Sequence, residues 1–180
     1  MQKKTMEELD RLAVHSFKLK KKFPMVLMLD QLRSGLNVGS LFRTADAFAL
    51  EHIVCVGYTP CPPHREVLKT ALGSAESVDW SHEQDIVSSI TLWKEKGYKI
   101  WALEQVHGST PLQQWQVSNE PMVLILGNEV TGVSEEALAL CDGFLEIEQF
   151  GTKHSLNVAV SGGMAIYQIV QHWSLVSSSI

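Results

Sequence analysis

Cysteine is scarce in this 180-residue chain, which contains only Cys55, Cys61 and Cys141. The three cysteines form no CxxC pair and no even-numbered set, so neither a disulfide framework nor a zinc site is expected. The seven histidines are scattered and do not gather with acidic residues at metal-ligand spacing. We therefore expect no bound metal, and a reducing, cytoplasmic setting.

Long hydrophobic runs are also missing. No apolar stretch approaches the roughly 20 residues that a membrane-spanning helix needs, so no membrane association is expected. The N-terminus, MQKKTMEELDRL, is charged and lacks the apolar core of a signal peptide. An apolar fraction of 45% is ordinary for a globular protein, and the length suits one domain with a substantial core.

Positive charge is in the minority, with a formal net charge of −5, which disfavours a general nucleic-acid binder. Its distribution is uneven, however, because seven of the 15 Lys and Arg residues precede residue 23: Lys3, Lys4, Arg11, Lys18, Lys20, Lys21 and Lys22. Such a cluster suits a phosphate backbone, and a solvated surface helix explains it equally well. We therefore divide the chain into a basic N-terminal helical extension, 1–22, and a main domain, 23–180.

The common nucleotide and hydrolase motifs are absent. There is no GxGxxG, GxSxG or HExxH, and the loop from Gly127 to Gly132 lacks the Lys-Ser/Thr that completes a phosphate-binding loop. The polar residues that remain in candidate loops are an arginine, a glutamate and several amides. This set favours positioning and proton handling over hydrolysis through a nucleophile.

Apolar runs alternate with amphipathic segments along the chain. Strands are expected at 25–29, 52–57, 76–80, 98–104, 121–127 and 143–149. The first expected helix is 5–20, where Thr5 and Glu8 form a capping box. A second helix follows the segment with Asn37 and Arg43 and ends near residue 50. Further helices are expected at 65–72, at 83–96, from about residue 134 onward, and at 155–173. This alternation predicts a mostly parallel α/β sheet.

Three polar, glycine-containing loops follow expected strands, at 33–43, 126–132 and 148–157. In an open parallel sheet, ligands bind beyond the carboxyl ends of the strands. The first loop contains Asn37 and Arg43, with Gly39 allowing close backbone approach to another group. We place Arg43 at the opening of a helix, where the dipole disfavours a cation. That placement suggests a ligand such as a phosphate, and an ordinary capped helix with a surface arginine is the alternative.

The three loops together resemble, in order and spacing, the three motifs of the SpoU/TrmH family of RNA 2′-O-ribose methyltransferases. Residues 37–45, NVGSLFRTA, are similar to its N-x-G-x-x-x-R-T-A motif. Residues 124–132, LILGNEVTG, are similar to L-x-x-G-x-E-x-x-G, and residues 151–158, GTKHSLNV, are similar to the third motif with S-L-N-V. The resemblance covers about residues 25–173, and three ordered motifs make it specific.

This resemblance implies a SPOUT-type parallel sheet flanked by helices, with a deep C-terminal trefoil knot, a rare exception to the rule against threading. It implies S-adenosylmethionine as cofactor and a homodimer with each active site near the interface. The substrate would be the ribose 2′-hydroxyl of an RNA. We expect tRNA rather than rRNA because the sequence shows no accessory RNA-binding domain.

The family motifs also imply site residues. The catalytic set is Asn37, Arg43, Glu129, Ser155 and Asn157, with Arg43 activating the hydroxyl. Asn37 would orient Arg43 or the hydroxyl, and Glu129 would hold Arg43 or the RNA. The cofactor set is Leu103, Leu126, Gly127, Asn128, Gly132, Ile147, Gln149, Ser155 and Leu156. Taken singly, Ser155 and Asn157 suit caps of the last helix and Glu129 suits a turn.

One position departs from the family pattern. The third motif normally begins with an apolar–proline pair, where this chain has Ile147-Glu148-Gln149. The main alternative function is a non-catalytic knotted RNA-binding or ribosome-assembly factor. A flavodoxin-like nucleotide-binding module is a weaker alternative, because the phosphate-loop glycines are absent.

Overall fold

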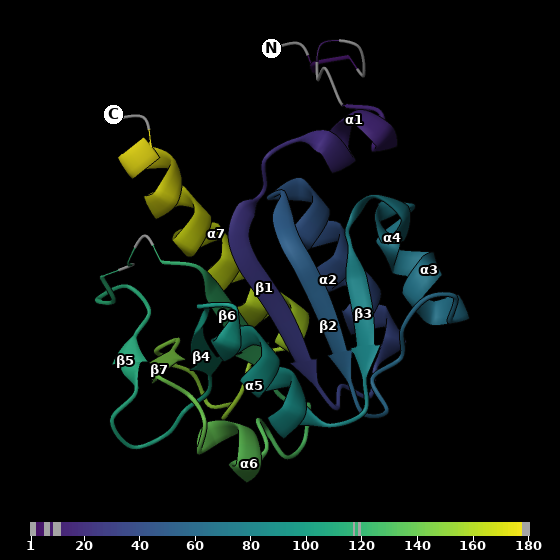
Figure 1. Ribbon diagram of the computed structural model, residues 1–180. Coiled ribbons are helices and arrows are strands. Elements are labelled where there is room, and N and C mark those ends of the chain that lie inside the picture. The colour runs from purple at the N-terminus through teal and green to yellow at the C-terminus, as the bar shows by residue number, and fades with distance from the viewer. Residues whose placement is uncertain (1–2, 6–7, 9–11, 117, 119, 178–180) are drawn as a thin grey trace.

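The computed structural model describes residues 3–5, 8, 12–116, 118 and 120–177, and within them a seven-stranded sheet in the order β3-β2-β1-β6-β4-β7-β5 (Figure 1). The strands are β1 Phe23–Asp30, β2 Leu50–Val56, β3 Trp80–Glu83, β4 Lys99–Leu103, β5 Thr110–Pro111, β6 Met122–Leu126 and β7 Gly143–Glu146. The helices are α1 Val14–Leu19, α2 Gly35–Ala47, α3 Arg65–Ala71, α4 Ser74–Ser77, α5 Ile86–Glu95, α6 Glu135–Leu138 and α7 Val158–Ser177. Every strand pair is parallel, which confirms the predicted parallel α/β sheet flanked by helices.

Helices cover both faces of this sheet (Figure 1). Side chains of successive β1 residues point to opposite faces. Met25, Leu27 and Leu29 accordingly pack with α2, α3 and α7, whereas Val26 and Met28 pack with α5 and α6. Because both faces are buried, the central strands β1 and β6 read as continuous apolar runs rather than as alternating patterns.

The strand order places the carboxyl ends of β1, β6, β4 and β7 along one edge, the lower edge in Figure 1. The three polar loops singled out in the sequence leave these strands. The N-terminal helix α1 lies at the other end of the sheet, near the start of β1 (Figure 1). Since an eight-residue strand spans about 26 Å, α1 and the polar loops are far apart in this chain.

The strand expected at 76–80 is wrong. The short helix α4 occupies Ser74–Ser77, and β3 begins only at Trp80. Gly73 has a φ of +92°, which turns the chain, and the Ser74 and Ser77 hydroxyls donate to the carbonyls of Ala71 and Ser74. Such local side-chain bonds favour a turn over a strand. The two-residue edge strand β5 was expected to be loop.

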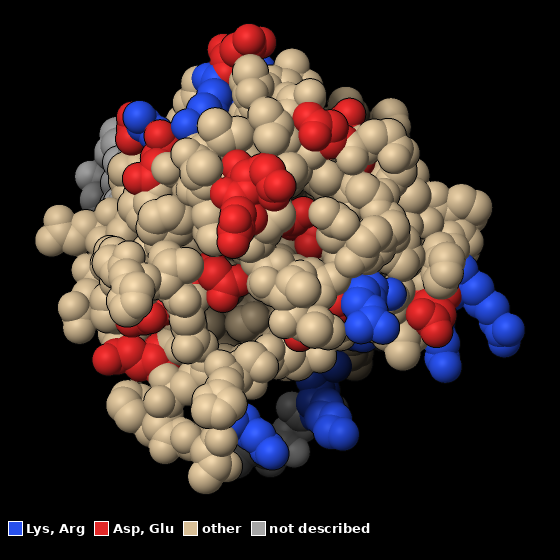
Figure 2. All heavy atoms as spheres, turned by 90° about the horizontal axis from the view of Figure 1, so that it is seen from below, with Lys and Arg blue, Asp and Glu red and all other residues tan. Residues whose placement is uncertain are grey.

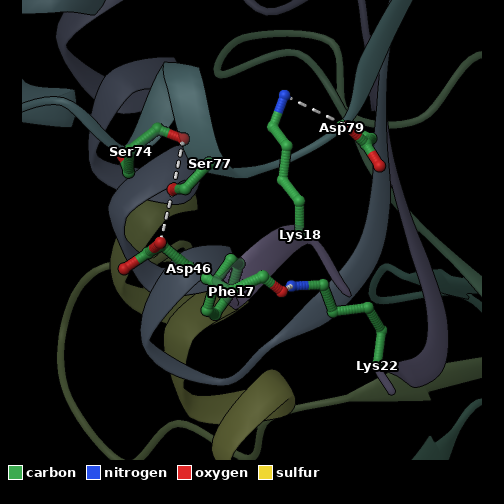
Figure 3. Close-up of polar contacts among 7 residues, drawn as sticks. All are labelled: Phe17, Lys18, Lys22, Asp46, Ser74, Ser77 and Asp79. Atoms are coloured by element: carbon green, nitrogen blue, oxygen red, sulfur yellow. Dashed lines mark hydrogen bonds and ion pairs between the residues drawn. The ribbon is translucent and has the colours of Figure 1, made fainter. Parts of the chain in front are cut away.

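The N-terminal extension is helical over a shorter range than expected. The reciprocal Thr5–Glu8 hydrogen bonds of the predicted capping box are present, at 2.6 and 3.2 Å, but the described helix is only Val14–Leu19. Residues 6–7 and 9–11 of the expected helix lie outside the described residues. Figure 3 shows Lys18 paired with Asp79 at 3.8 Å, and the Lys22 ammonium donating to the Phe17 carbonyl at 2.5 Å. Lys18 of the basic cluster therefore contacts the main domain, and Lys22 binds within the extension itself.

Candidate active site

Helix α2 begins well before Arg43. The Ser34 hydroxyl accepts the backbone N–H of Asn37 at 3.3 Å and forms the N-cap, so Asn37 lies in the first turn and Arg43 in the third. The expectation that Arg43 stands at the helix opening is therefore wrong. Its charge does not oppose the positive end of the dipole, which acts only within the first turn.

Gly39 does allow a close approach, and the neighbour is helix α3. A β-carbon built at Gly39 would lie 2.2 Å from the Val67 carbonyl oxygen and 2.2 Å from the Thr70 hydroxyl. The Thr70 hydroxyl also donates to the Leu36 carbonyl at 2.9 Å. The glycine of the first motif therefore serves helix packing in this chain rather than contact with a ligand.

The three polar loops meet through a chain of hydrogen bonds. The Glu129 carboxylate accepts the backbone N–H groups of Arg33 at 2.9 Å and Ser34 at 3.1 Å, and the side-chain amide of Asn37 at 2.9 Å. The Asn37 carbonyl oxygen in turn accepts the Asn157 amide at 3.1 Å. Residues separated by about 120 positions in sequence are thus joined at one point.

The direction of this chain follows from Glu129, which can only accept hydrogen bonds when ionised. Asn37 must therefore turn its NH₂ group toward Glu129 and its oxygen toward Asn157. Asn157 then directs its own oxygen to the N–H groups of Ala159 and Val160, at 3.0 and 3.3 Å, where α7 begins. Asn157 is a helix cap and a member of the network at once.

Glu129 is held as a carboxylate. Partial burial would raise its pKa, but hydrogen bonds from the Arg33 N–H, the Asn37 side chain and the Ser34 N–H outweigh this and hold the pKa below its ordinary value. A lowered pKa in the folded state stabilises the protein above the ordinary pKa of about 4.5. This contribution is lost as the pH falls through the lower, folded-state value.

We expect Glu129→Gln to flatten the acid limb of the stability profile. The free energy of unfolding of the parent protein, measured with urea, should fall between pH 6 and pH 3.5 more steeply than that of the variant. Glu135→Gln is a matched control, because no hydrogen bond from a neighbouring loop reaches the Glu135 carboxylate within the described residues. Identical stability profiles for the parent and Glu129→Gln would contradict a lowered pKa of Glu129 in the folded protein.

A pocket of about 580 Å³ opens beside this network, at the carboxyl ends of β4, β6 and β7. All nine residues of the predicted cofactor set line it: Leu103, Leu126, Gly127, Asn128, Gly132, Ile147, Gln149, Ser155 and Leu156. Glu129 and Asn157 line it too, and Asn37 reaches it through its hydrogen bonds to both. The structure thus brings together four of the five residues of the predicted catalytic set.

Arg43 lies elsewhere in the protomer. It lines a separate groove of about 510 Å³ formed by α2 and α3. Among the residues that the structure describes, Arg43 has no hydrogen bond or ion pair, so it is bonded to neither Glu129 nor Asn37 within this chain. The exposed position of Arg43 on the helix leaves its guanidinium available to another molecule.

The loop 127–132 is tightly built. Asn128 and Gly132 exchange two backbone hydrogen bonds, at 3.0 and 2.9 Å. The Asn128 side chain donates to the Gln31 carbonyl and the Tyr58 hydroxyl and accepts the N–H groups of Val130 and Thr131. Since an amide has two donors and two lone pairs, this side chain is fully used, and only its backbone is available to a ligand.

Several pocket residues were not expected. Glu104 accepts the Val133 N–H at 2.9 Å and so ties the end of β4 to the loop 127–132, and the Gln105 amide donates to the His154 carbonyl at 3.3 Å. Both follow a strand directly, so the rule that sites lie beyond strand ends could have identified them. Glu148, which replaces the family proline, accepts a hydrogen bond from Gln113, and its neighbours Ile147 and Gln149 still line the pocket.

Two of the three cysteines are weakly acidic thiols. Burial raises the pKa of Cys55 to about 12 and that of Cys141 to about 11, which keeps both thiols protonated. Within residues 3–5, 8, 12–116, 118 and 120–177 no three His, Cys, Asp or Glu side chains gather to hold a metal ion. No helix in those ranges combines the length and apolarity needed to cross a membrane.

Comparison with known proteins identifies the family. Residues 24–167 match the SpoU rRNA Methylase family. The chain belongs to this family. It is 29% identical over 156 residues to an uncharacterized tRNA/rRNA methyltransferase of Borreliella burgdorferi, covering 87% of this chain and 68% of the relative. It is also 29% identical to the 23S rRNA (guanosine-2′-O-)-methyltransferase RlmB of Neisseria meningitidis, over 79% of this chain but only 56% of the relative.

Solved structures share the fold. The TrmH/SpoU tRNA modifying enzyme of A. aeolicus superposes with a TM-score of 0.81 at 22% identity, over 91% of this chain and 84% of that chain. The AdoMet-bound rRNA methyltransferase of Sinorhizobium meliloti gives a TM-score of 0.77 at 24% identity, over 87% of this chain and 60% of that chain. The architecture of this SpoU family chain is therefore that of known RNA methyltransferases.

Proposed function

We propose that this SpoU family protein transfers a methyl group from S-adenosylmethionine to a ribose 2′-hydroxyl of RNA. The observation that carries the proposal is the Glu129–Asn37–Asn157 network at the 580 Å³ pocket, which unites all three family motifs. The RlmB relative is a guanosine-2′-O-methyltransferase, which supports the choice of acceptor. The non-catalytic alternative is disfavoured, because it gives no reason for the pocket and network to coexist.

The pocket residues fit S-adenosylmethionine. Apolar side chains of Leu103, Leu126 and Leu156 suit the adenine ring, and the tight loop 127–132 presents backbone groups for its polar edge. Glu104, Glu129 and Glu146 line the pocket and no Lys or Arg does, which suits a cationic ligand. S-adenosylmethionine supplies an electrophilic methyl group on a positively charged sulfur.

The protein's part in the reaction is alignment and electrostatics. Transfer to an oxygen needs an in-line approach, and the orientation fixed by the asparagine network suits the placement of a ribose. Arg43 stays protonated and cannot act as a base. We assign to it the stabilisation of negative charge that develops on the 2′-oxygen, with the proton leaving to a phosphate oxygen of the RNA.

We further propose a homodimer in which Arg43 of one protomer serves the pocket of the other. Val160, Met164 and Tyr167 form an exposed apolar stripe on α7, spaced by one helical turn each. Tyr167 contacts Phe48 edge to face, and Phe48 lines the groove that contains Arg43. Pairing of this stripe would bring Arg43 toward a second copy, whereas Arg43 does not line the 580 Å³ pocket of its own chain.

Met164→Arg should convert the dimer to monomers. A buried charge without a partner opposes association strongly, so we expect at least a hundredfold weaker dimer and a matching loss of methyl transfer. Sedimentation and mass photometry measure the association. Leu92→Arg is the matched control, because Leu92 on α5 is 44% exposed and Met164 is 45% exposed. If the Met164→Arg variant still forms the dimer, another surface of the protein must form the interface.

The proposed substrate is tRNA. A structure described as concerning the 2-OH methylation of C/U34 on tRNA superposes with a TM-score of 0.73, and the match covers 96% of that chain. The rRNA methyltransferase from Sinorhizobium meliloti is matched over 60% of its length.

We also propose that the segments 126–132 and 147–158, which line one pocket, form the knot that the family resemblance implies.

Two measurements test the function. Calorimetric titration with S-adenosylmethionine should give micromolar binding, and Leu126→Glu, which places a charge on an apolar wall, should abolish it. Mass spectrometry of digested tRNA after incubation with the protein and cofactor should show a new 2′-O-methylnucleoside. Binding without methylation of tRNA or rRNA would favour the non-catalytic factor, and methylation of a base would overturn the ribose assignment.

A further inference from the structure

We propose that the groove between α2 and α3 binds a phosphodiester of the RNA, with Lys69 as a phosphate-binding residue beside Arg43. The groove measures about 510 Å³, and Ser40, Arg43, Thr44, Ala47, Phe48, Lys69, Thr70 and Leu72 line it. Neither the sequence motifs nor the pocket described above includes Lys69. The identity of the ligand as RNA rests on the proposed function.

The close packing of the two helices creates this arrangement. Gly39 lets α2 approach the backbone of α3 at Val67, and Thr70 binds the Leu36 carbonyl across the contact. Arg43 follows Gly39 by one helical turn, and Lys69 precedes Thr70 directly. The glycine contact therefore sets a guanidinium and an ammonium on facing walls of one groove.

The cations are the donors available to an anion in this groove. The hydroxyls of Ser40, Thr44 and Thr70 already donate to main-chain carbonyls, at 2.8, 3.0 and 2.9 Å. No Asp or Glu lines the groove, and within the described part of the chain neither Arg43 nor Lys69 has a hydrogen bond or ion pair. Two uncompensated positive charges attract a phosphate, and Arg offers it a planar fork while Lys offers a point charge.

The chemistry of the RNA backbone connects this groove to methyl transfer. The 2′-hydroxyl and the 3′-phosphate stand on adjacent carbons of one ribose. If Arg43 approaches the hydroxyl, a neighbouring phosphate comes within reach of the cation beside Arg43. The apolar wall of Ala47, Phe48 and Leu72 suits the sugar and base of a flanking nucleotide.

The test compares Lys69→Gln with the parent protein in binding unfractionated tRNA across a salt series. We expect about tenfold weaker binding at low salt and a slope of log affinity against log salt reduced by about 0.7 to 0.9, the value of one lost phosphate contact. Lys69→Arg should retain both properties. Lys99→Gln is the matched control, because Lys99 is exposed at the start of β4, away from the groove.

Each outcome decides the proposal. Binding and salt slope in Lys69→Gln equal to those of Lys99→Gln would overturn it, and so would loss of the dimer, which would show that a second copy fills the groove. The affinity for S-adenosylmethionine should be unchanged. A reduced slope in a protein that never methylates RNA would keep the groove and reject the proposed function, so the two failures are distinguishable.

Discussion

Arg43→Ala is expected to slow methyl transfer by a factor of about 100 to 1,000, the effect of removing one group that stabilises developing negative charge. The affinity for S-adenosylmethionine should stay unchanged, because Arg43 does not line the 580 Å³ pocket. Single-turnover incorporation of a labelled methyl group into tRNA measures the rate. Arg65→Ala, an exposed arginine of α3 outside the groove lining, is the control and should remain fully active.

Mixed dimers distinguish action within one protomer from action across the interface. If Arg43 serves the partner's pocket, a dimer of Arg43→Ala and Glu129→Ala protomers contains one complete site. Random mixing of two inactive variants should then restore about a quarter of the parent activity. Complementation fails if Arg43 works within its own protomer, since both sites of the mixed dimer would carry a defect. Full activity of Arg43→Ala alone would remove this residue from the mechanism.

The charge on the face at the carboxyl ends of the strands explains why contacts between this protein and an RNA must be local. Figure 2 views the molecule from this end, where Asp and Glu side chains lie at the centre and around it, while Lys and Arg side chains lie toward the periphery on several sides. This distribution agrees with the overall charge of −5. An RNA that approaches this end meets repulsion over the centre and attraction at cations on the periphery, so a few cations can set its orientation.

The convergence of Asn37, Glu129 and Asn157 was predictable because each follows the end of a strand in one parallel sheet. The position of Arg43 was not, since it depends on where α2 begins. With Ser34 as the cap, Arg43 lies six residues beyond Asn37 inside the helix, about 240° around its axis. The same motif spacing that suggested a catalytic pair therefore separates the two side chains onto different faces.

Short elements were the other failure of the sequence analysis. The four-residue helix α4 and the two-residue strand β5 are too short to show a hydrophobic period. Helix α4 depends instead on the turn at Gly73 and on contacts such as the 2.5 Å hydrogen bond from Ser77 to Asp46 of α2, seen in Figure 3. Tertiary contacts of this kind leave no periodic signal in the sequence.

Gly127→Ala should greatly weaken the binding of S-adenosylmethionine. A β-carbon at this position would lie 2.1 Å from the Val133 nitrogen and 2.2 Å from the Gly132 carbonyl carbon, and backbone atoms cannot rotate away as a side chain can. The loop 127–132 must therefore shift, which breaks the paired bonds between Asn128 and Gly132 and the Glu104 bond to Val133. We expect at least a hundredfold weaker binding by calorimetry, with a stability cost of about 1 to 3 kcal/mol.

Gly151→Ala is the matched control for Gly127→Ala. Gly151 belongs to the third motif, yet a β-carbon there meets no atom within 4 Å and its φ is not in the left-handed region. The control should change stability by no more than about 0.5 kcal/mol and leave cofactor affinity as in the parent. A Gly127→Ala protein that unfolds cooperatively and still binds the cofactor normally would show that the loop 127–132 is not a wall of the cofactor site. If both substitutions weaken cofactor binding equally, the loss would follow from changing any glycine of the motifs, and the packing of the loop 127–132 would not be its cause.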